Sequence, residues 1–272
     1  MRALVVLALL LLTACGPQIG DLEKGEEGRV VRAFNGDTLE LDSGLRVFLA
    51  EIDAPRGEAD YAAQAQAELE ALALHREVRL AYGGTRRWAP RQREGDTSTP
   101  RETAIAHVYV RSEGGRWFWL QHELVQRGAA YVRPRRDNHA RAETLIALED
   151  AARAGEQGLW GRRPYRAVTP RAAATAAVAA DVSCLNGAAP WRVVEAQVGD
   201  ARTFDTRASL ALGTEEAPFD IVVFGESFSA WDGPPLGSLT GARIRARGPI
   251  GMYRGVPQLC LDHASQLAVI TE

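Results

Sequence analysis

Short runs of alternating apolar and polar residues, separated by turn residues, recur along the chain and are typical of β-strands. Two such runs lie at residues 28–41 and 46–55. An Asn-Gly pair before Asp37 favours a tight hairpin in the first run, and Pro55 ends the second because proline cannot donate a hydrogen bond to a sheet. We therefore predict that turns present Asp37 and Asp53 at strand ends. There they either act as ordinary turn carboxylates or bind a hard cation such as Ca²⁺.

The second half of the chain repeats the strand-like pattern after an alanine-rich segment. Residues 167–182 have no stripe of large apolar side chains, which predicts a linker or a marginal helix. Beyond them, five apolar runs are separated by turn residues: Trp191–Gln197, Arg207–Leu212, Phe219–Phe224, Ala242–Arg247 and Leu259–Leu261. Strands at such intervals predict a small β-barrel or sandwich over residues 183–272.

The N-terminal residues predict export. One arginine and a short apolar run precede a Leu-Thr-Ala-Cys sequence that ends at Cys15, which fits the lipobox of a bacterial lipoprotein. We predict a signal peptide at residues 1–15, acylation of Cys15 and a polar tether at residues 16–27. These features predict a lipid-anchored, periplasm-facing protein of the cell envelope, and Gly16 in place of an aspartate after the cysteine favours passage to the outer membrane in a cell with two membranes. The alternative is an ordinary cleaved signal with an incidental cysteine.

Charge and the remaining cysteines narrow the choice of function. The chain has 32 basic and 35 acidic residues, a formal net charge of −3, which argues against a strongly basic, non-specific nucleic-acid binder. Cys184 and Cys260 remain once Cys15 is used, and an even pair in an oxidising compartment predicts one disulfide. Two separate buried thiols are the alternative. The sequence has no cysteine or histidine cluster that indicates zinc, and we expect no small-molecule cofactor.

The first half of the chain resembles the thermonuclease (staphylococcal-nuclease-like) family. The resemblance rests on Asn-Gly-Asp-Thr-Leu-Glu-Leu ending at Leu41, on Ile-Asp-Ala-Pro ending at Pro55, and on Gly-Leu-Trp ending at Trp160. It implies a mainly β fold with α-helices over residues 28–166, an OB-type five-stranded β-barrel with flanking helices. It also implies hydrolysis of DNA and RNA phosphodiester bonds with bound Ca²⁺.

The family's catalytic positions are substituted in this chain. The resemblance implies three Ca²⁺ ligands: Asp37, Asp53 and the carbonyl of Ala54. The family also uses a glutamate that prepares the attacking water and two arginines that stabilise charge on the phosphate. The corresponding positions hold, in that order, Arg56, Phe48 and Thr103. Each substitution removes a group that the reaction needs.

Three charged residues lie close to the substituted positions in the sequence. Arg46 lies two residues before Phe48 on the same strand face, while Glu58 and Arg101 lie two residues from the other positions. Each is equally explained as a solvated surface charge. Retained activity would require all three to substitute at once. We therefore interpret the site as degenerate, with any Ca²⁺ weakly bound or absent.

An arginine-rich segment at residues 86–101 replaces the tight turn of the family. It contains five arginines, two acidic residues and Trp88. Arginine and aromatic side chains together can grip phosphates and stack on bases. The candidate nucleic-acid contacts are Arg86, Arg87, Trp88, Arg91 and Arg93, with Tyr253 from the second half. Contact with anionic lipid, contact with an acidic partner and a mobile, solvated insertion are the alternatives.

The last hairpin of the chain resembles that of OB-fold nucleic-acid-binding domains. Residues 248–259 read Gly-Pro-Ile-Gly-Met-Tyr-Arg-Gly-Val-Pro-Gln-Leu, and the resemblance implies a second small OB-like β-barrel. The leading hypothesis is an envelope-anchored, thermonuclease-like protein that binds single-stranded nucleic acid or an envelope protein without cleaving it. The alternatives are an active Ca²⁺-dependent extracytoplasmic nuclease and a structural envelope protein.

Overall fold

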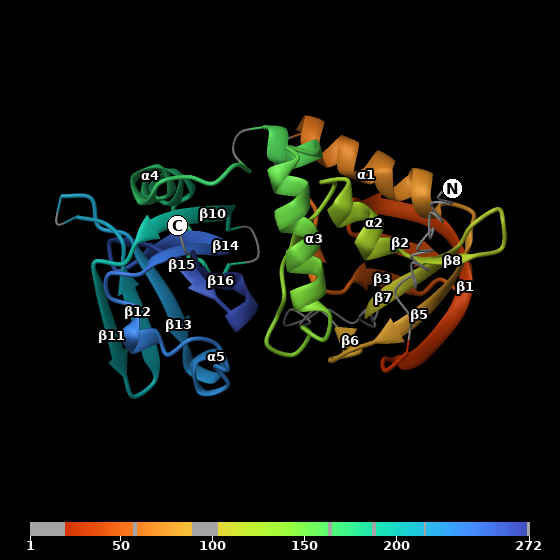
Figure 1. Ribbon diagram of the computed structural model, residues 1–272. Coiled ribbons are helices and arrows are strands. Elements are labelled where there is room, and N and C mark those ends of the chain that lie inside the picture. The colour runs from red at the N-terminus through yellow and green to blue at the C-terminus, as the bar shows by residue number, and fades with distance from the viewer. Residues whose placement is uncertain are drawn as a thin grey trace, which may run out of the picture.

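The computed structural model describes residues 20–56, 59–88, 103–162, 165–186, 189–214 and 216–270. Five of the predicted functional residues lie outside the described residues: Cys15, Glu58, Arg91, Arg93 and Arg101. The described chain forms two β-sheet domains, and helix α3 (Ala142–Ala154) lies between them (Figure 1).

The first domain has the predicted OB fold. Its main strands are β1 (Glu23–Asn35), β2 (Thr38–Leu41), β3 (Arg46–Leu49), β5 (Glu77–Tyr82) and β7 (Thr103–Arg111). They pair in a closed cycle in the order β1-β2-β3-β7-β5, in which only β3 and β7 are parallel. The remaining elements are β4 (Ile52–Asp53), β6 (Arg87–Trp88), β8 (Trp117–Trp119), β9 (Tyr131–Val132), α1 (Ala59–Ala73), α2 (Leu120–Gln126) and the 3₁₀ helix η1 (Gly158–Gly161). The predicted class, mainly β with helices, is confirmed.

Two turns place the predicted aspartates at strand ends. Asn35 pairs with Thr38, so the residues between them, Gly36 and Asp37, form the tight turn of the β1–β2 hairpin. Gly36 is required there because a Cβ atom would lie 2.5 Å from the Cβ of Ala65 in α1. In β4, Asp53 pairs with Tyr131 of β9, and the strand ends before the proline that follows.

The second domain contains a second β-sheet, as predicted. Its strands are β10 (Trp191–Gln197), β11 (Asp200–Phe204), β12 (Arg207–Ala211), β13 (Asp220–Phe224), β14 (Arg243–Tyr253), β15 (Val256–Leu261) and β16 (Leu267–Val269). The strand order is β10-β14-β15-β13-β12-β11, with β13 and β15 parallel and β16 paired to β14. The helices are α4 (Pro170–Ala180), α5 (Gly225–Ser229), η2 (Leu236–Ser238) and η3 (Ala264–Gln266). A disulfide joins Cys184 to Cys260 of β15, with 5.8 Å between the Cα atoms.

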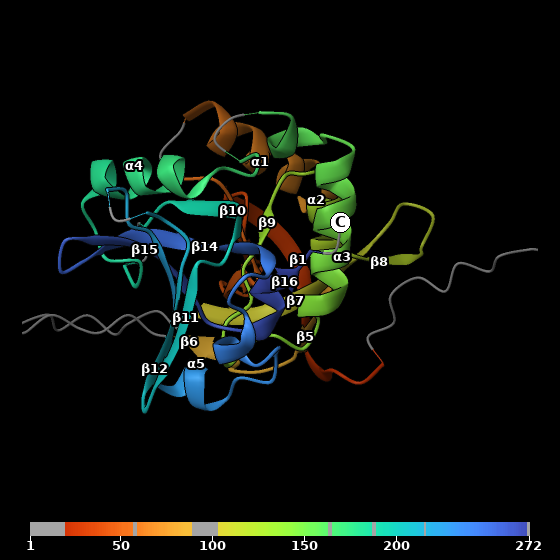
Figure 2. The same ribbon diagram turned by 60° about the vertical axis from the view of Figure 1, so that its left-hand side comes forward.

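Two segments, one predicted as a polar tether and the other as a linker or a marginal helix, contain regular elements. Residues 23–27, predicted as part of a tether, begin β1 and pair with β5. Residues 170–180, in the predicted linker, form α4, which packs against β14, β15 and β10 (Figure 2). Thr169 caps α4, and Ala173 and Ala177 are fully buried in the core of the second domain. Over the described ranges, no helix is long and apolar enough to cross a bilayer.

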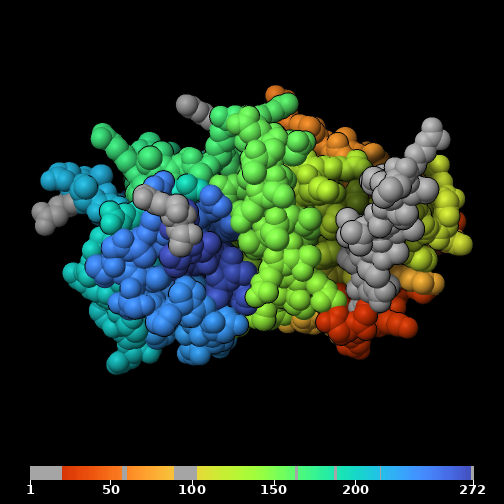
Figure 3. All heavy atoms as spheres, in the orientation of Figure 1, coloured from red at the N-terminus to blue at the C-terminus, as the bar shows by residue number. Residues whose placement is uncertain are grey.

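The two domains share a buried interface, and Figure 3 shows atoms of α3 packed against the second domain on one face. The rings of Tyr131 and Trp191 stack with centroids 4.6 Å apart. Arg247 of β14 donates a hydrogen bond of 2.7 Å to Glu149 of α3, and both side chains are buried. The interface therefore combines stacked aromatic rings with a buried ion pair.

Candidate functional site

Each of the two predicted ligand carboxylates is paired with an arginine. Arg56 donates from Nη2 to both oxygens of Asp37, at 2.9 Å to Oδ1 and 2.7 Å to Oδ2. Arg133 donates from Nη1 to Oδ2 of Asp53 at 2.5 Å. The pairing of β4 with β9 explains the second contact, because Tyr131 lies opposite Asp53 and Arg133 follows two residues later. Two guanidinium groups thus neutralise two carboxylates.

Asp37 is buried and its hydrogen-bonding capacity is filled. Besides Arg56, Oδ1 accepts from the hydroxyl of Thr38 at 2.8 Å, and Oδ2 accepts from the N–H of Ala54 at 2.7 Å. Burial, with the charge of Asp53, raises the pKa of the Asp37 carboxyl above its ordinary value, and Arg56 opposes that shift. Although burial lowers it, the charges of Asp37 and Asp53 hold the pKa of Arg56 above its ordinary value.

These contacts do not fit a Ca²⁺ site of the kind that the resemblance implies. Ca²⁺ takes about six to eight oxygen ligands, but both oxygens of Asp37 are already engaged by donors. The guanidinium of Arg56, 2.7 Å from Asp37, would also repel a second cation. Over the residues that the structure describes, no group of three or more His, Cys, Asp or Glu side chains is arranged to hold a metal ion.

Phe48 and Thr103, two of the three positions to which the resemblance assigns a catalytic role, lie on the neighbouring strands β3 and β7. Phe48 of β3 packs on Trp88 of β6, with ring centroids 5.9 Å apart. Thr103 of β7 is buried, and its Cα atom pairs across the sheet with those of Trp88 and Arg46. The guanidinium of Arg46 stacks over the ring of Phe34 at 4.1 Å, and Arg46 is not among the residues that line the adjacent cavity.

A cavity of about 570 Å³ opens beside the paired carboxylates. Its lining is Asp37, Phe48, Leu49, Ala50, Glu51, Ile52, Asp53, Arg56, Thr85, Trp88, Ile105, Arg133, Arg135, Asp137 and Asn138. Phe48, Trp88 and Ile105 give it an aromatic and aliphatic wall, and 49 % of Trp88 is exposed. The cavity therefore joins an apolar wall to the paired carboxylates of Asp37 and Asp53.

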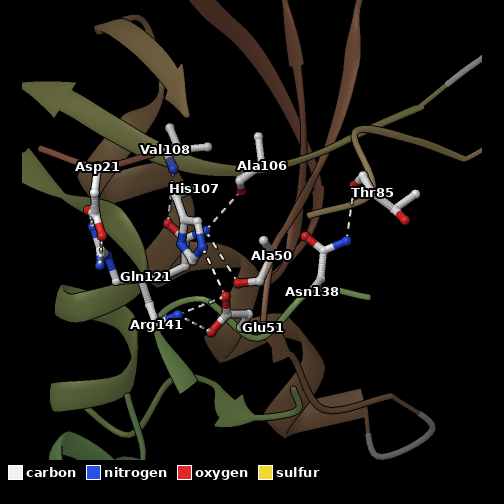
Figure 4. A network of polar contacts seen from close by, with 10 residues as sticks. All are labelled: Asp21, Ala50, Glu51, Thr85, Ala106, His107, Val108, Gln121, Asn138 and Arg141. Carbon is white, nitrogen blue, oxygen red and sulfur yellow. Dashed lines mark hydrogen bonds and ion pairs between the residues drawn. The ribbon is translucent and has the colours of Figure 1, made fainter. Parts of the chain in front are cut away.

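A buried polar network supports one side of the cavity (Figure 4). Glu51 has a φ of 65°, a conformation that residues other than glycine rarely adopt. Its carboxylate lies 3.1 Å from Nε2 of His107 and accepts the N–H of Arg141 at 3.1 and 3.0 Å. Nδ2 of Asn138 donates to the carbonyl of Thr85 at 3.0 Å, whereas Oδ1 of Asn138 is buried and has no hydrogen-bond partner among the residues that the structure describes. These contacts join Glu51 and Asn138 of the cavity lining to neighbouring residues, and they leave one acceptor unused among the described residues.

The predicted nucleic-acid contacts that the structure describes lie in three places. Arg86 donates to Glu23 at 2.7 Å and stacks on Tyr82, while Arg87 contacts Glu26 and the hydroxyl of Tyr82. These two arginines are therefore neutralised by acids of β1. Trp88 instead faces the cavity, and Tyr253, 42 % exposed, lies in the second domain.

The comparisons with known proteins bear on the first domain. Residues 46–162 match the family model described as staphylococcal nuclease homologue. This match supports a staphylococcal-nuclease-like domain, and that family is in general Ca²⁺-dependent. The matched span is less than half of the chain; it begins after the hairpin that carries Asp37 and ends before the second domain. No curated protein is similar enough to the chain to count as a match.

Sequence reasoning missed three residues that shape the nuclease-like site: Glu51, Arg133 and Asn138. Arg133 and Asn138 lie far along the chain from the aspartates, and only the β4–β9 pairing and the loop after β9 bring them close. Glu51 directly precedes the Ile-Asp-Ala-Pro element, but nothing local distinguishes it from a surface glutamate. The sequence offers no local signal for these three contacts.

Proposed function

We propose that this chain binds single-stranded nucleic acid through a staphylococcal-nuclease-like domain that no longer cleaves it. The observation that carries the proposal is the contact of Arg56 with Asp37, in which an arginine stands where the family has its water-activating glutamate. A guanidinium cannot act as a general base, and it neutralises a carboxylate that a metal would need.

The two phosphate-stabilising arginines are also missing from the site. Phe48 and Thr103 hold their positions, and Arg46 stacks on Phe34 instead of lining the cavity. Loss of one preorganised donor typically lowers kcat by about 10²–10³. Because three groups are altered, we expect any residual rate of cleavage to lie several powers of ten below that of an intact enzyme, even if the three effects are not additive.

The second domain supports the binding role. Its strand order, with the parallel pair β13–β15, is consistent with an OB-like fold. The guanidinium of Arg207 lies 4.7 Å from the ring of Phe204, and Arg207 pairs across the sheet with Phe224. The ring of Phe224 lies 6.4 Å from that of Tyr253. Alternating aromatic and arginine side chains are typical of surfaces that bind single strands.

Hydrolysis and binding should be measured side by side on the soluble chain that follows the predicted signal peptide. A fluorescently labelled single-stranded DNA oligonucleotide is incubated with Ca²⁺ or with a chelator. We expect no cleavage in either condition, and binding that weakens as salt increases. Ca²⁺-dependent cleavage that Asp37→Ala abolishes would instead establish an active nuclease.

Two variants test whether the residues at positions 48, 56 and 103 explain the proposed loss of cleavage. We expect Phe48→Arg, Arg56→Glu and Thr103→Arg together to produce measurable Ca²⁺-dependent cleavage, because they restore the base and both phosphate-stabilising groups. Arg56→Glu alone should restore binding of Tb³⁺, a luminescent Ca²⁺ substitute, without cleavage. If Tb³⁺ binds the unmodified chain as tightly as this variant, the contact of Arg56 with Asp37 does not block the metal site.

We also propose that Cys15 is acylated and anchors the chain in the cell envelope, with the described domains facing the periplasm. The support is the Leu-Thr-Ala-Cys sequence after a short apolar run. Cys15→Ser, or globomycin, should leave the precursor unprocessed or release the chain from the membrane fraction. Normal processing and membrane retention of the serine variant would contradict the anchor, and binding to an envelope protein would then lose its main rationale.

A further inference from the structure

The cavity beside Asp37 and Asp53 has the features of a small-molecule site rather than of a phosphate-cleaving site. Its volume of about 570 Å³ lies within the roughly 300–1,000 Å³ that is usual for ligand pockets. Phe48 and Trp88 form an aromatic corner, and about half of the large indole of Trp88 is exposed. A flat aromatic ligand can cover this exposed indole.

Two buried polar atoms of the lining have no hydrogen-bond partner within the described part of the chain. Oδ1 of Asn138 is an unused acceptor on a side chain that is 1 % exposed, and Nε of Arg133 is an unused donor on one that is 8 % exposed. Because Nδ2 of Asn138 donates to Thr85, the amide orientation is fixed and Oδ1 lies on the side of Ala50, which also lines the cavity (Figure 4). Buried polar groups are rarely left unpaired. A ligand with both a donor and an acceptor would satisfy both atoms.

Charges of both signs lie around this apolar corner, because three arginines and four acidic residues line the cavity, and two of the arginines are paired with Asp37 and Asp53. Arg56 and Arg135 also line the cavity, and both are exposed in part. Arg56 is engaged by Asp37, whereas Arg135 is exposed and has no ion pair among the described residues, so Arg135 is the guanidinium that can contact a phosphate next to a bound ring. A planar ring with hydrogen-bond donors and acceptors on its edge, carried on a phosphate backbone, is a nucleobase.

We infer that this cavity binds one unpaired base of a single-stranded nucleic acid, stacked on Trp88 and hydrogen-bonded by Asn138. This inference rests on the proposed function and refines it. The base occupies the space next to Phe48, the position at which the family has a phosphate-stabilising arginine. The substitution that removes catalysis thus also creates the pocket.

The test uses the full-length chain in detergent and a 12-nucleotide single strand with one 2-aminopurine, a base whose fluorescence is quenched by stacking. We expect the 2-aminopurine fluorescence to be quenched when the strand binds the unmodified chain. Trp88→Ala should abolish this quenching and weaken binding by about 5- to 150-fold, which is the contribution of one stacked base. Trp88→Phe should retain most of the affinity. Trp117→Ala is the matched control, because Trp117 lies outside the cavity lining, and it should bind as the unmodified chain does.

A strand of equal length and charge that has abasic sites throughout separates base binding from phosphate binding. We expect the abasic strand to bind the unmodified chain more weakly than the base-containing strand does. This difference should become smaller in the Trp88→Ala variant, in which only Asn138 and the aromatic side chains of the second domain can still contact bases. Equal affinity of both strands for the unmodified chain, with no quenching, would overturn the pocket and leave the proposed function intact. If no strand binds at all, both fail. Binding only of a tryptophan-containing peptide would assign the pocket to a protein partner.

Discussion

Arg56 is half exposed, yet it reaches the buried carboxylate of Asp37 with two hydrogen bonds. Asp37 cannot move away, because Thr38 and the backbone of Ala54 hold the same two oxygens. A buried carboxylate without a counter-charge is costly, and burial already raises the pKa of Asp37 above its ordinary value. Arg56 supplies this counter-charge.

Replacing Arg56 by glutamine should destabilise the protein in a pH-dependent way. The pKa of Asp37 should rise further, because the variant lacks the positive charge that opposes the shift. A carboxyl whose pKa is higher in the folded than in the unfolded state lowers the free energy of unfolding at high pH. This destabilisation disappears as the pH falls through the raised pKa. After allowance for solvent screening, we expect Arg56→Gln to lower the free energy of unfolding by about 1–2 kcal/mol at pH 8 and by less near pH 4.5.

Urea unfolding at the two pH values measures this change. Arg127→Gln is the control, since Arg127 is similarly exposed but its partners, Glu68 and Glu123, lie at the surface. The control should lose less than about 1 kcal/mol at either pH. A loss for Arg56→Gln that is the same at pH 8 and pH 4.5 would show that Asp37 is not the carboxylate involved.

The sequence predicts those turns and strands that depend on local signals. The hairpin before Asp37, the break at Pro55 and the main strands of both domains follow from turn residues and alternation. The first residues of β1 do not, because Glu23–Glu27 is polar and forms a strand only through backbone pairing with β5. The same pairing supplies the acids that neutralise Arg86 and Arg87, which no local pattern indicates.

Helix α4 was predicted only as a linker or a marginal helix because its buried face is made of alanine. Ala173 and Ala177 are four residues apart, so they lie on one face, and both are fully buried against the second domain. Alanine is small, so the stripe it forms does not stand out from its alanine-rich surroundings. Its size instead allows the helix to approach the sheet closely.

Enlarging this face should therefore destabilise the second domain. We expect Ala177→Leu to lower the free energy of unfolding by about 1–3 kcal/mol, because the extra atoms have no space in the core. Ala179, on the exposed face of the same helix, provides the control, and Ala179→Leu should have almost no effect. Chemical denaturation of both variants measures the difference. Equal stability of the two would mean that α4 is a loose linker in solution.

At the scale of the whole molecule, the two domains meet around one buried charge cluster. Arg247 donates to Glu149 at 2.7 Å and to Asp150 at 2.9 Å, and the second oxygen of Glu149 accepts the N–H of Val132 at 2.6 Å. Burial raises the pKa of Glu149 above its ordinary value, and Arg247 opposes that shift. Val132 directly precedes Arg133, so the interface also supports the wall of the cavity.

Replacing only Arg247 of the Arg247–Glu149 pair should lower the free energy of unfolding far more than replacing both residues. Arg247→Met leaves Glu149 buried without its partner, and we expect a loss of about 3–5 kcal/mol in the free energy of unfolding. Adding Glu149→Gln should recover much of that loss, because the amide is uncharged and its oxygen can still accept the N–H of Val132. Arg202→Met, which removes an exposed pair with Asp200, is the control and should cost less than about 1 kcal/mol. Urea unfolding of the single and double variants gives the coupling energy. If Arg247→Met costs no more than this control, the two domains do not bury the pair in solution, and the cavity wall is not supported through Val132.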